Sequence, residues 1–275
     1  MDTALQEKYE RLRTFIELNG KDGVVIAFSG GVDSSTLAAI CHDVLGDKAI
    51  AVSGKSATYP LEELEEARYI AETIGIEHVI VETHEIENEK FLDNPENRCY
   101  YCKSELLDQL HEIARQRGFK AVFEGTNASD LHGHRPGYKA IKERDDVFSP
   151  LVETDISKDE IREIAKDLGF VFFDKPASPC LASRIPYGER ITNERLERID
   201  AAEYFLKAET GIKELRVRDH GQMARIEVPR DDMAKLMEPE IMDRIVAKFK
   251  EIGYVYITLD IEGFRSGSML EGMAK

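Results

Sequence analysis

A short apolar run, a loop of glycine and serine, and a helix that begins with small residues follow one another near the start of the chain. Residues 23–28 (GVVIAF) have the composition of a buried parallel strand. The loop that follows, SGGVDSS, also contains Asp33, a candidate ligand for Mg²⁺. Glycines let the backbone approach an anion closely, while hydroxyls and N–H groups at a helix start donate to phosphate oxygens. The residues that we expect to bind phosphate are Ser29, Gly30, Gly31, Ser34 and Ser35.

The first part of the chain alternates between strand and helix patterns. A helix is expected over residues 5–18, ahead of the first strand. Further strands are expected at 49–53, 78–81 and 121–124, and further helices up to residue 45, at 61–74 and at about 101–117. This alternation predicts an α/β protein with a doubly wound parallel sheet, in which ligands bind at the carboxyl ends of the strands.

Two irregular stretches follow. Residues 125–150 contain glycines and prolines without a sustained period, which predicts a long loop over the active face. Residues 174–188 form a second, proline-containing stretch and mark the expected boundary between a nucleotide domain (1–185) and a substrate-binding and oligomerisation domain (186–275). The later part is expected to be a small α+β domain with a helix at 193–209, strands at 214–218, 223–228 and 254–260, and helices up to 251.

The charge of the chain limits its partners. A net charge of −16 and a pI of about 5.0 disfavour a long nucleic acid, which proteins hold mainly through cationic contacts to phosphates. The sequence has no apolar stretch of the length that a membrane span needs. We therefore expect a cytoplasmic protein that acts on a small molecule, with neither a membrane nor a long nucleic acid as partner.

The loop differs from the common P-loop because it lacks the lysine of that motif. In its strand-loop-helix context, the string SGGVDSS resembles the pyrophosphatase loop of the ATP pyrophosphatases, also called adenine nucleotide alpha hydrolases. The resemblance implies that ATP is split into pyrophosphate and AMP, and that the AMP is placed on a substrate oxygen. It also implies that Ser53, after the second strand, lies near the adenosine.

Three of the four cysteines occur where sulfur or metal chemistry is plausible on physical grounds. Cys99 and Cys102 stand at the expected start of a helix, where the positive dipole end favours thiolates. Cys180 follows a proline in an irregular segment, whereas Cys41 is expected in the core. Three thiolates can hold a 4Fe-4S cluster with one open iron, or zinc with an open position. The alternative is three reduced cysteines that share no ligand.

Over nearly the whole chain, the motifs resemble the LarE family of ATP-dependent sulfur transferases, which build the nickel-pincer nucleotide cofactor. The segments that carry the resemblance are CLASRIPYG from Cys180 to Gly188, RVR from Arg216 to Arg218, ARIE from Ala224 to Glu227, and GFRSG from Gly263 to Gly267. The resemblance implies that ATP adenylates a carboxylate of pyridinium-3,5-biscarboxylic acid mononucleotide and that sulfur then displaces AMP. It also implies that Cys180 donates sulfur, that Glu227 binds a metal, and that Arg184 lies in the substrate site.

Two arginines in that region also make sense from strand geometry. Arg216 and Arg218 are two residues apart on an expected strand, so they point to the same face and can aim at one phosphate. Together with Arg265 they could clamp a nucleotide phosphate, although solvated surface arginines are the simpler alternative. Lys103 is a candidate for neutralising the pyrophosphate or the adenylate, and an exposed helix lysine is its commoner role.

Members of the family that sacrifice the sulfur of one cysteine lack the Cys99 and Cys102 pair. The pair here implies instead a cluster-dependent enzyme, with Cys99, Cys102 and Cys180 as iron ligands and an unidentified sulfur donor. A homo-oligomer, with a hexamer as one form, is also implied. Alternatives with a similar loop are a tRNA thiolase, an ammonia-dependent adenylating ligase such as an NAD or GMP synthetase, and a non-catalytic ATP or metal sensor.

Overall fold

The computed structural model describes residues 1–132, 136–265 and 267–273. The early elements form a five-stranded sheet in the order β3-β2-β1-β4-β5. Its strands are β1 (Val24–Ala27), β2 (Ala49–Lys55), β3 (Glu77–Glu82), β4 (Ala121–Phe123) and β5 (Val147–Phe148). All neighbouring pairs are parallel, so the carboxyl ends of the strands lie at the same end of the sheet. The predicted parallel sheet is therefore confirmed.

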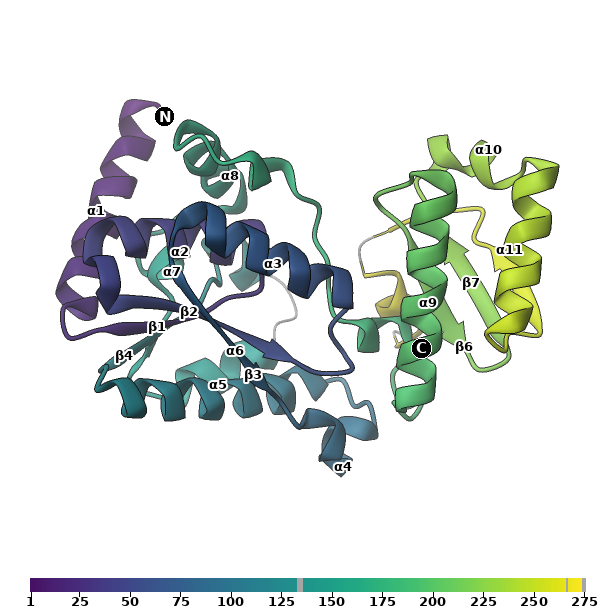
Figure 1. The fold of residues 1–275 in the computed structure, drawn as a ribbon, viewed down its shortest axis with the longest axis horizontal. Helices are drawn as coiled ribbons and strands as arrows, with labels where there is room; N and C mark the ends of the chain where they lie inside the picture. Colours follow the sequence, from purple (N-terminus) through teal and green to yellow (C-terminus); the bar gives the residue numbers. More distant parts are fainter. Residues whose placement is uncertain (133–135, 266, 274–275) are drawn as a thin grey trace. The chain divides into compact units, whose positions relative to one another are not determined.

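Helices cover both faces of this sheet (Figure 1). One face packs against α1 (Thr3–Gly20), α2 (Val32–Leu45), α3 (Leu61–Ile74), α7 (Pro150–Glu153) and α8 (Lys158–Asp167). The other packs against α5 (Arg98–Arg117) and α6 (Pro136–Lys142). Within β1, Val24 and Ile26 belong to the first core and Val25 and Ala27 to the second. Because successive strand residues face opposite ways, a strand covered on both sides is apolar throughout.

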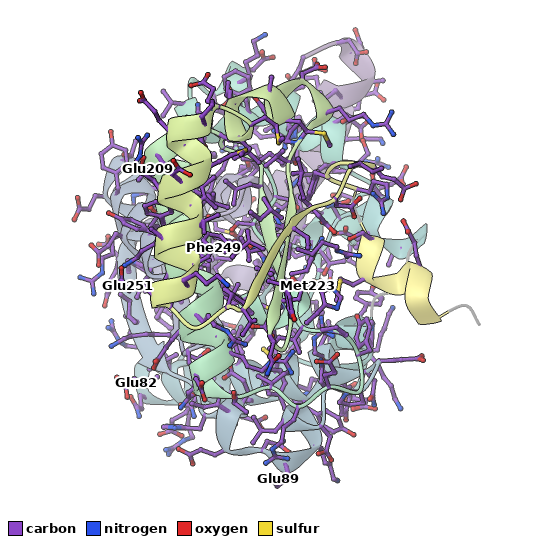
Figure 2. All side chains as sticks on the ribbon, turned by 90° about the vertical axis from the view of Figure 1, so that its right-hand side faces the viewer. Glu82, Glu89, Glu209, Met223, Phe249 and Glu251 are labelled. Carbon is purple, nitrogen blue, oxygen red and sulfur yellow. The ribbon has the colours of Figure 1, made fainter. Side chains whose placement is uncertain are left out.

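The C-terminal elements form a three-stranded sheet of β6 (Arg216–His220), β7 (Met223–Glu227) and β8 (Tyr256–Leu259). The β6–β7 pair is antiparallel and the β7–β8 pair is parallel. The helices beside it are α9 (Asn193–Thr210), α10 (Met233–Leu236) and α11 (Pro239–Glu251). Phe249 of α11, labelled in Figure 2, is fully buried in the same core as Leu206 and Ile226. The predicted small α+β region is confirmed.

One expectation about the elements was wrong. Residues 125–150 are not one long loop, because they contain α6 and β5. Both are short, and β5 has only two residues, too few for a hydrophobic period to mark them. Helix α5 begins at Arg98, close to the expected start at about residue 101, and Cys99 and Cys102 lie in its first turns, as expected. Among the described residues, no helix combines the length and the apolar character that crossing a membrane requires.

The chain divides into two compact units that do not follow the linear sequence. The first unit comprises Met1–Glu85 and Asn97–Ser178, and the second comprises Ile86–Glu96 and Pro179–Lys275. Helix α4 (Glu89–Leu92) stands between β3 and α5 in the sequence and belongs to the second unit. The expected domain boundary after residue 185 stays a prediction.

Candidate functional site

The loop after β1 requires glycine at its centre. Gly30 has a φ of +66°, a conformation that an L side chain rarely adopts. A Cβ atom on Gly30 would lie 2.8 Å from the Cβ and 2.9 Å from the Cα of Ala67 in α3. Gly31 is the N-cap of α2, so the loop ends at the N-terminus of a helix. Unpaired N–H groups and the positive dipole end make this a place for an anion.

The hydroxyl groups of the loop bond to one another and to its backbone. The N–H of Ser29 donates to Ser34 Oγ (3.1 Å), and the two Oγ atoms lie 3.1 Å apart. Ser35 is fully buried, and its Oγ has no hydrogen-bond partner within the described parts of the chain. A buried hydroxyl left without a partner costs about 1–3 kcal/mol, which a bound oxygen acceptor removes. Ser35 is therefore suited to donate to a phosphate.

Asp33, in the first turn of α2, lies among polar side chains from two later segments. Its Oδ1 accepts a hydrogen bond from Lys158 Nζ (2.6 Å), and its Oδ2 accepts one from Asn127 Nδ2 (3.2 Å). Burial raises the pKa of Asp33, and this effect outweighs the opposing attraction of Lys158. A carboxylate that is costly to bury gains from a divalent cation, so the arrangement suits Mg²⁺. The role of Asp33 as a Mg²⁺ ligand stays a prediction.

Ser53 lies buried in β2, behind the loop. Its hydroxyl donates to the carbonyl of Phe28 (2.7 Å) and lies 2.8 Å from His78 Nε2. Because the hydroxyl proton goes to Phe28, Nε2 of His78 carries a hydrogen and donates to Ser53. Burial lowers the pKa of His78, and Arg68 adds to the effect. Ser53 therefore fixes the residue before the loop, and its contact with the nucleotide stays a prediction.

Lys103 is held by a buried carboxylate. Its Nζ lies 3.2 Å from Oε2 of Glu124, which follows β4, and the Lys103 side chain is 24% exposed. Glu124 in turn accepts hydrogen bonds from the N–H (3.2 Å) and Oγ1 (2.7 Å) of Thr126, and from Ser149 Oγ. The next residue, Gly125, lies against the start of α2, since a Cβ on it would be 3.1 Å from the nitrogen of Ser34. The ion pair therefore adjoins the loop.

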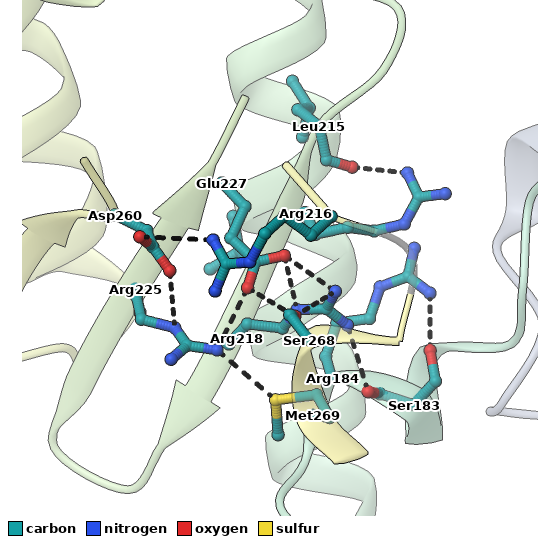
Figure 3. Close-up of polar contacts among 12 residues, drawn as sticks. Ser183, Arg184, Leu215, Arg216, Arg218, Arg225, Glu227, Asp260, Ser268 and Met269 are labelled. Atoms are coloured by element: carbon teal, nitrogen blue, oxygen red, sulfur yellow. Dashed lines mark hydrogen bonds and ion pairs between the residues drawn. The ribbon is translucent and has the colours of Figure 1, made fainter. Parts of the chain in front are cut away.

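The second unit contains an arginine cluster, made of Arg184, Arg216, Arg218 and Arg225 (Figure 3). Arg184 ends the turn η5 (Leu181–Arg184) and is only 1% exposed. Its Nε and Nη2 donate to the two carboxylate oxygens of Glu203 in α9, each at 2.8 Å. Burial by itself would lower the pKa of Arg184, but Glu203 outweighs it and the pKa is raised. Nη1 of Arg184 also donates to the carbonyl of Cys180 (3.1 Å), which anchors that residue's backbone.

Strands β6 and β7 carry the other three arginines on one face. The register pairs Arg216 with Glu227 and Arg218 with Arg225. Glu227 is fully buried, and its Oε2 accepts from Nε (2.9 Å) and Nη2 (2.7 Å) of Arg218. Its Oε1 accepts from Arg225 Nη2 (3.0 Å) and Ser268 Oγ (2.8 Å). Glu227 therefore holds two arginines in place, and its expected role as a metal ligand stays a prediction.

Arg216 lies in surroundings that disfavour its charge. Its Nη1 donates to the carbonyl of Leu215 (2.6 Å), and its guanidinium lies 5.1 Å from the ring centroid of Phe264. Burial lowers the pKa of Arg216 to about 10, and Arg184 and Arg218 contribute by repulsion. A bound anion would relieve both effects, which is the condition expected of a phosphate site.

Arg265 has acidic partners of its own. Its Nε and Nη2 donate to the carboxylate of Glu271 (3.1 and 3.2 Å), and Nη2 lies 2.9 Å from Glu262. Glu271 is the largest of the acidic influences that raise the pKa of Arg265. Its expected share in a phosphate clamp stays a prediction.

The four cysteines all lie within the described residues, and none forms a disulfide. Cys41 is fully buried, which confirms it as a core residue. Cys99 is exposed and Cys102 partly buried, both in the first turns of α5, whereas Cys180 is partly buried at the start of η5. Cys99 and Cys102 belong to the first unit and Cys180 to the second. Over the described ranges, no group of three or more His, Cys, Asp or Glu side chains is arranged to hold a metal ion. The three-cysteine site stays a prediction.

Several residues that contact the predicted ones were not themselves predicted. Lys158 is 125 residues from Asp33 in the sequence, and Lys175 is 145 residues from Gly30, to whose carbonyl it donates. Glu203, the partner of Arg184, lies on a helix that is otherwise unremarkable in sequence. No local pattern marks such contacts, because they form only when distant segments pack together.

The SGGVDSS loop, placed between a central parallel strand and a helix N-terminus, defines a PP-loop nucleotide-binding protein of the adenine nucleotide alpha hydrolase type. In agreement, the model of the NAD synthase family matches residues 4–119. The matched region begins in α1, contains the loop, and ends just after α5.

Relatives cover almost the whole chain. It is 44% identical to an uncharacterized protein of Synechocystis sp. over 98% of its own length and 100% of the relative. It is 34% identical to the pyridinium-3,5-bisthiocarboxylic acid mononucleotide synthase of Lactiplantibacillus plantarum, over 92% of this chain and 90% of that protein. A GMP synthase of Thermus thermophilus is 32% identical over 68% of this chain but only 40% of its own length. The chain therefore belongs to the LarE family of PP-loop proteins and is an ATP-dependent enzyme.

Proposed function

We propose that this enzyme adenylates a carboxylate of pyridinium-3,5-biscarboxylic acid mononucleotide and then replaces AMP by sulfur. The relative from L. plantarum is named for the bisthiocarboxylic acid of the same mononucleotide. The observation that carries the proposal is the presence, in one chain, of a PP-loop and of an arginine cluster in which burial, together with repulsion from Arg184 and Arg218, lowers the pKa of Arg216. The first suits ATP, and the second suits a substrate with a phosphate group.

In the first step, a substrate carboxylate oxygen attacks the α-phosphorus of ATP, and pyrophosphate leaves with the electron pair of the broken P–O bond. The N–H groups of the loop and the hydroxyl of Ser35 bind the pyrophosphate oxygens. Asp33 would hold Mg²⁺, which would supply neutralising charge to the phosphates. Lys103, fixed by Glu124, adds positive charge beside the loop.

In the second step, a sulfide equivalent attacks the acyl carbon of the adenylate. The C–O bond to AMP breaks, AMP leaves with its electron pair, and a thiocarboxylate remains, without net oxidation or reduction. Arg216 and Arg218 hold the phosphate of the mononucleotide throughout. Binding energy from this remote phosphate orients the reacting carboxylate.

We further propose that Cys99, Cys102 and Cys180 ligate a 4Fe-4S cluster that supplies the sulfur. The support is chemical, since thiolates are the usual ligands of such clusters and Cys99 and Cys102 lie at a positive helix end. Anaerobic iron and sulfide analysis should give four irons per chain, and alanine at any of the three positions should abolish them. Cys41→Ala is the matched control and should keep the iron. Stoichiometric zinc, or loss of hydrogen sulfide from Cys180 after one turnover, would contradict the cluster.

The central experiment measures pyrophosphate release and analyses the product by mass spectrometry. Pyrophosphate should appear only with ATP and the biscarboxylic mononucleotide, and the product should be heavier by the difference between sulfur and oxygen. An amide product with ammonium would indicate an ammonia-dependent ligase. Pyrophosphate release that requires tRNA would indicate a tRNA thiolase. The expected homo-oligomer and the identity of the sulfur donor stay predictions.

A further inference from the structure

Two carbonyl groups of the PP-loop, those of Ser29 and Gly30, are bonded by side chains from outside the loop. The carbonyl of Ser29 accepts a hydrogen bond from the hydroxyl of Tyr59, and that of Gly30 accepts one from Lys175 Nζ at 3.2 Å. Burial raises the pKa of Tyr59, and Glu63 and Glu66 add to the effect, so its hydroxyl keeps the proton that it donates. Two acceptors that would repel a phosphate are thus occupied by the protein.

The direction of these carbonyls sets the direction of the loop's N–H groups. In a trans peptide, the C=O and the following N–H point opposite ways. Anchoring the oxygens of Ser29 and Gly30 therefore turns the N–H groups of Gly30 and Gly31 away from Tyr59 and Lys175. The N–H of Gly31 donates a hydrogen bond to Ser29 Oγ (N to Oγ, 3.4 Å), which places it on the side of the loop hydroxyls. The backbone N–H groups and the hydroxyl groups then lie on the same side of the loop, where pyrophosphate can accept hydrogen bonds from both.

The peptide between Gly30 and Gly31 is the one most able to turn over. It is flanked by glycine on both sides, and no Cβ atom restricts rotation of the peptide plane. A flipped peptide would present the Gly30 oxygen to the phosphates and withdraw the Gly31 N–H. Something outside the loop must therefore favour the conformation that binds an anion.

Lys175 is held firmly enough to do this. Its side chain is only 8% exposed, and Nζ lies 2.8 Å from Glu63 and 2.9 Å from Glu66, both in α3. Its own carbonyl accepts a hydrogen bond from Arg162 Nη2 (2.9 Å). Ala67, beside these glutamates in α3, is the residue that backs Gly30. The lysine and the helix thus form one support behind the loop.

We infer that Lys175 is a positioning residue for ATP: it fixes the Gly30 carbonyl and so presets the N–H groups of the loop to receive the pyrophosphate. This inference rests on the proposed use of the loop for ATP. Because Nζ of Lys175 already has three acceptors within the protein, we expect it to act on ATP through the loop, so that its loss weakens ATP binding without affecting the site for the mononucleotide.

The test compares Lys175→Met with Lys8→Met. Lys8 is a matched control in the same unit, since its Nζ lies 2.9 Å from Glu160 and 3.4 Å from Asp155 and donates to the carbonyl of Asp155. ATP affinity is measured by equilibrium binding, together with the KM for ATP and for the mononucleotide in pyrophosphate release. Lys175→Met should weaken ATP binding about 10- to 100-fold and leave the KM for the mononucleotide unchanged. Lys175→Arg should recover part of the loss, and Lys8→Met should bind ATP as the wild type does.

In Lys175→Met, Glu63 and Glu66 lose their cationic partner, and the loss could unfold this single variant. Lys175→Met combined with Glu63→Gln and Glu66→Gln removes that charge and should show the same selective loss of ATP affinity. Wild-type ATP affinity in a folded Lys175→Met protein would overturn the inference, as would an equal loss for ATP and the mononucleotide. Failure of the wild type itself to bind ATP would instead overturn the proposed function.

Discussion

The PP-loop and the arginine cluster are both suited to phosphate, but they offer different kinds of hydrogen-bond donor. The loop offers neutral donors, namely backbone N–H groups and hydroxyls, and depends on glycine conformation at Gly30. The arginine cluster offers full charges that are buried and held by Glu203 and Glu227. The loop is therefore sensitive to backbone geometry, whereas the cluster is sensitive to the loss of a charge. The two regions should fail in different ways, and substitutions can show this.

The largest effect is expected at Asp33. Asp33→Asn removes the charge that we propose to hold Mg²⁺, and it should lower the rate of pyrophosphate formation about 10²- to 10³-fold, measured with both substrates saturating. Asp43→Asn is the matched control, because Asp43 lies in the same helix and pairs with Arg13 at the surface. Normal turnover in Asp33→Asn would show that Asp33 takes no part in the reaction.

A smaller, binding-specific effect is expected in the arginine cluster. Arg216→Met should raise the Kd for the mononucleotide about 10- to 100-fold, since a charge-assisted bond to its phosphate is lost. The KM for ATP should not change. Arg244→Met, at an exposed ion pair with Glu209, serves as the control. If Arg216→Met weakened ATP and mononucleotide binding alike, the separation of the two phosphate sites would be wrong.

The pH dependence distinguishes the regions further. The pKa of Arg216 is lowered to about 10, so its guanidinium is charged below that pH and loses its charge above it. Affinity for the mononucleotide should therefore fall about tenfold as the pH rises to about one unit above this value. The affinity of Arg216→Met for the mononucleotide should not show this fall with pH, which calorimetric titrations at several pH values can test. An identical decline in the variant would assign the effect to other groups.

The smallest effect concerns stability. The pKa of Asp33 is raised by burial, so the ionised carboxylate disfavours the folded state at neutral pH. Asp33→Asn should therefore raise the midpoint of thermal unfolding at neutral pH. The gain should vanish as the pH falls below the usual range of an aspartate, where both proteins are neutral at this position. A gain that persisted in acid would have another cause.

The sequence predicted those parts of the molecule whose signal is local. The strand-loop-helix around Gly30 is set by residues that are neighbours in the chain. The pair Arg216 and Arg218 was recognisable from the two-residue period of a strand. The parallel sheet with helices on both faces also followed, because strands that alternate with helices favour that architecture.

The parts that escaped prediction depend on contacts between distant segments. The partners of Asp33 and Gly30, Lys158 and Lys175, are ordinary lysines until α8 and the segment after it pack beside the loop. Glu227 carries no sign in the sequence that arginines will surround it. Strand β5 was missed because two residues are too few for a period.

The segment Ile86–Glu96 leaves the ribosome long before the rest of the second unit, to which it belongs. Asn94 is fully buried there with a φ of +51°, and its Nδ2 donates at 2.7 Å to the carbonyl of Pro186, 92 residues later. At roughly 5–20 residues per second, the segment emerges roughly 5–20 s before that partner is made. During this time it lacks the later residues of the second unit that bury it in the full-length chain. A nascent chain stopped before Pro179 should therefore be cleaved by protease near Asn94, and the full-length chain should resist.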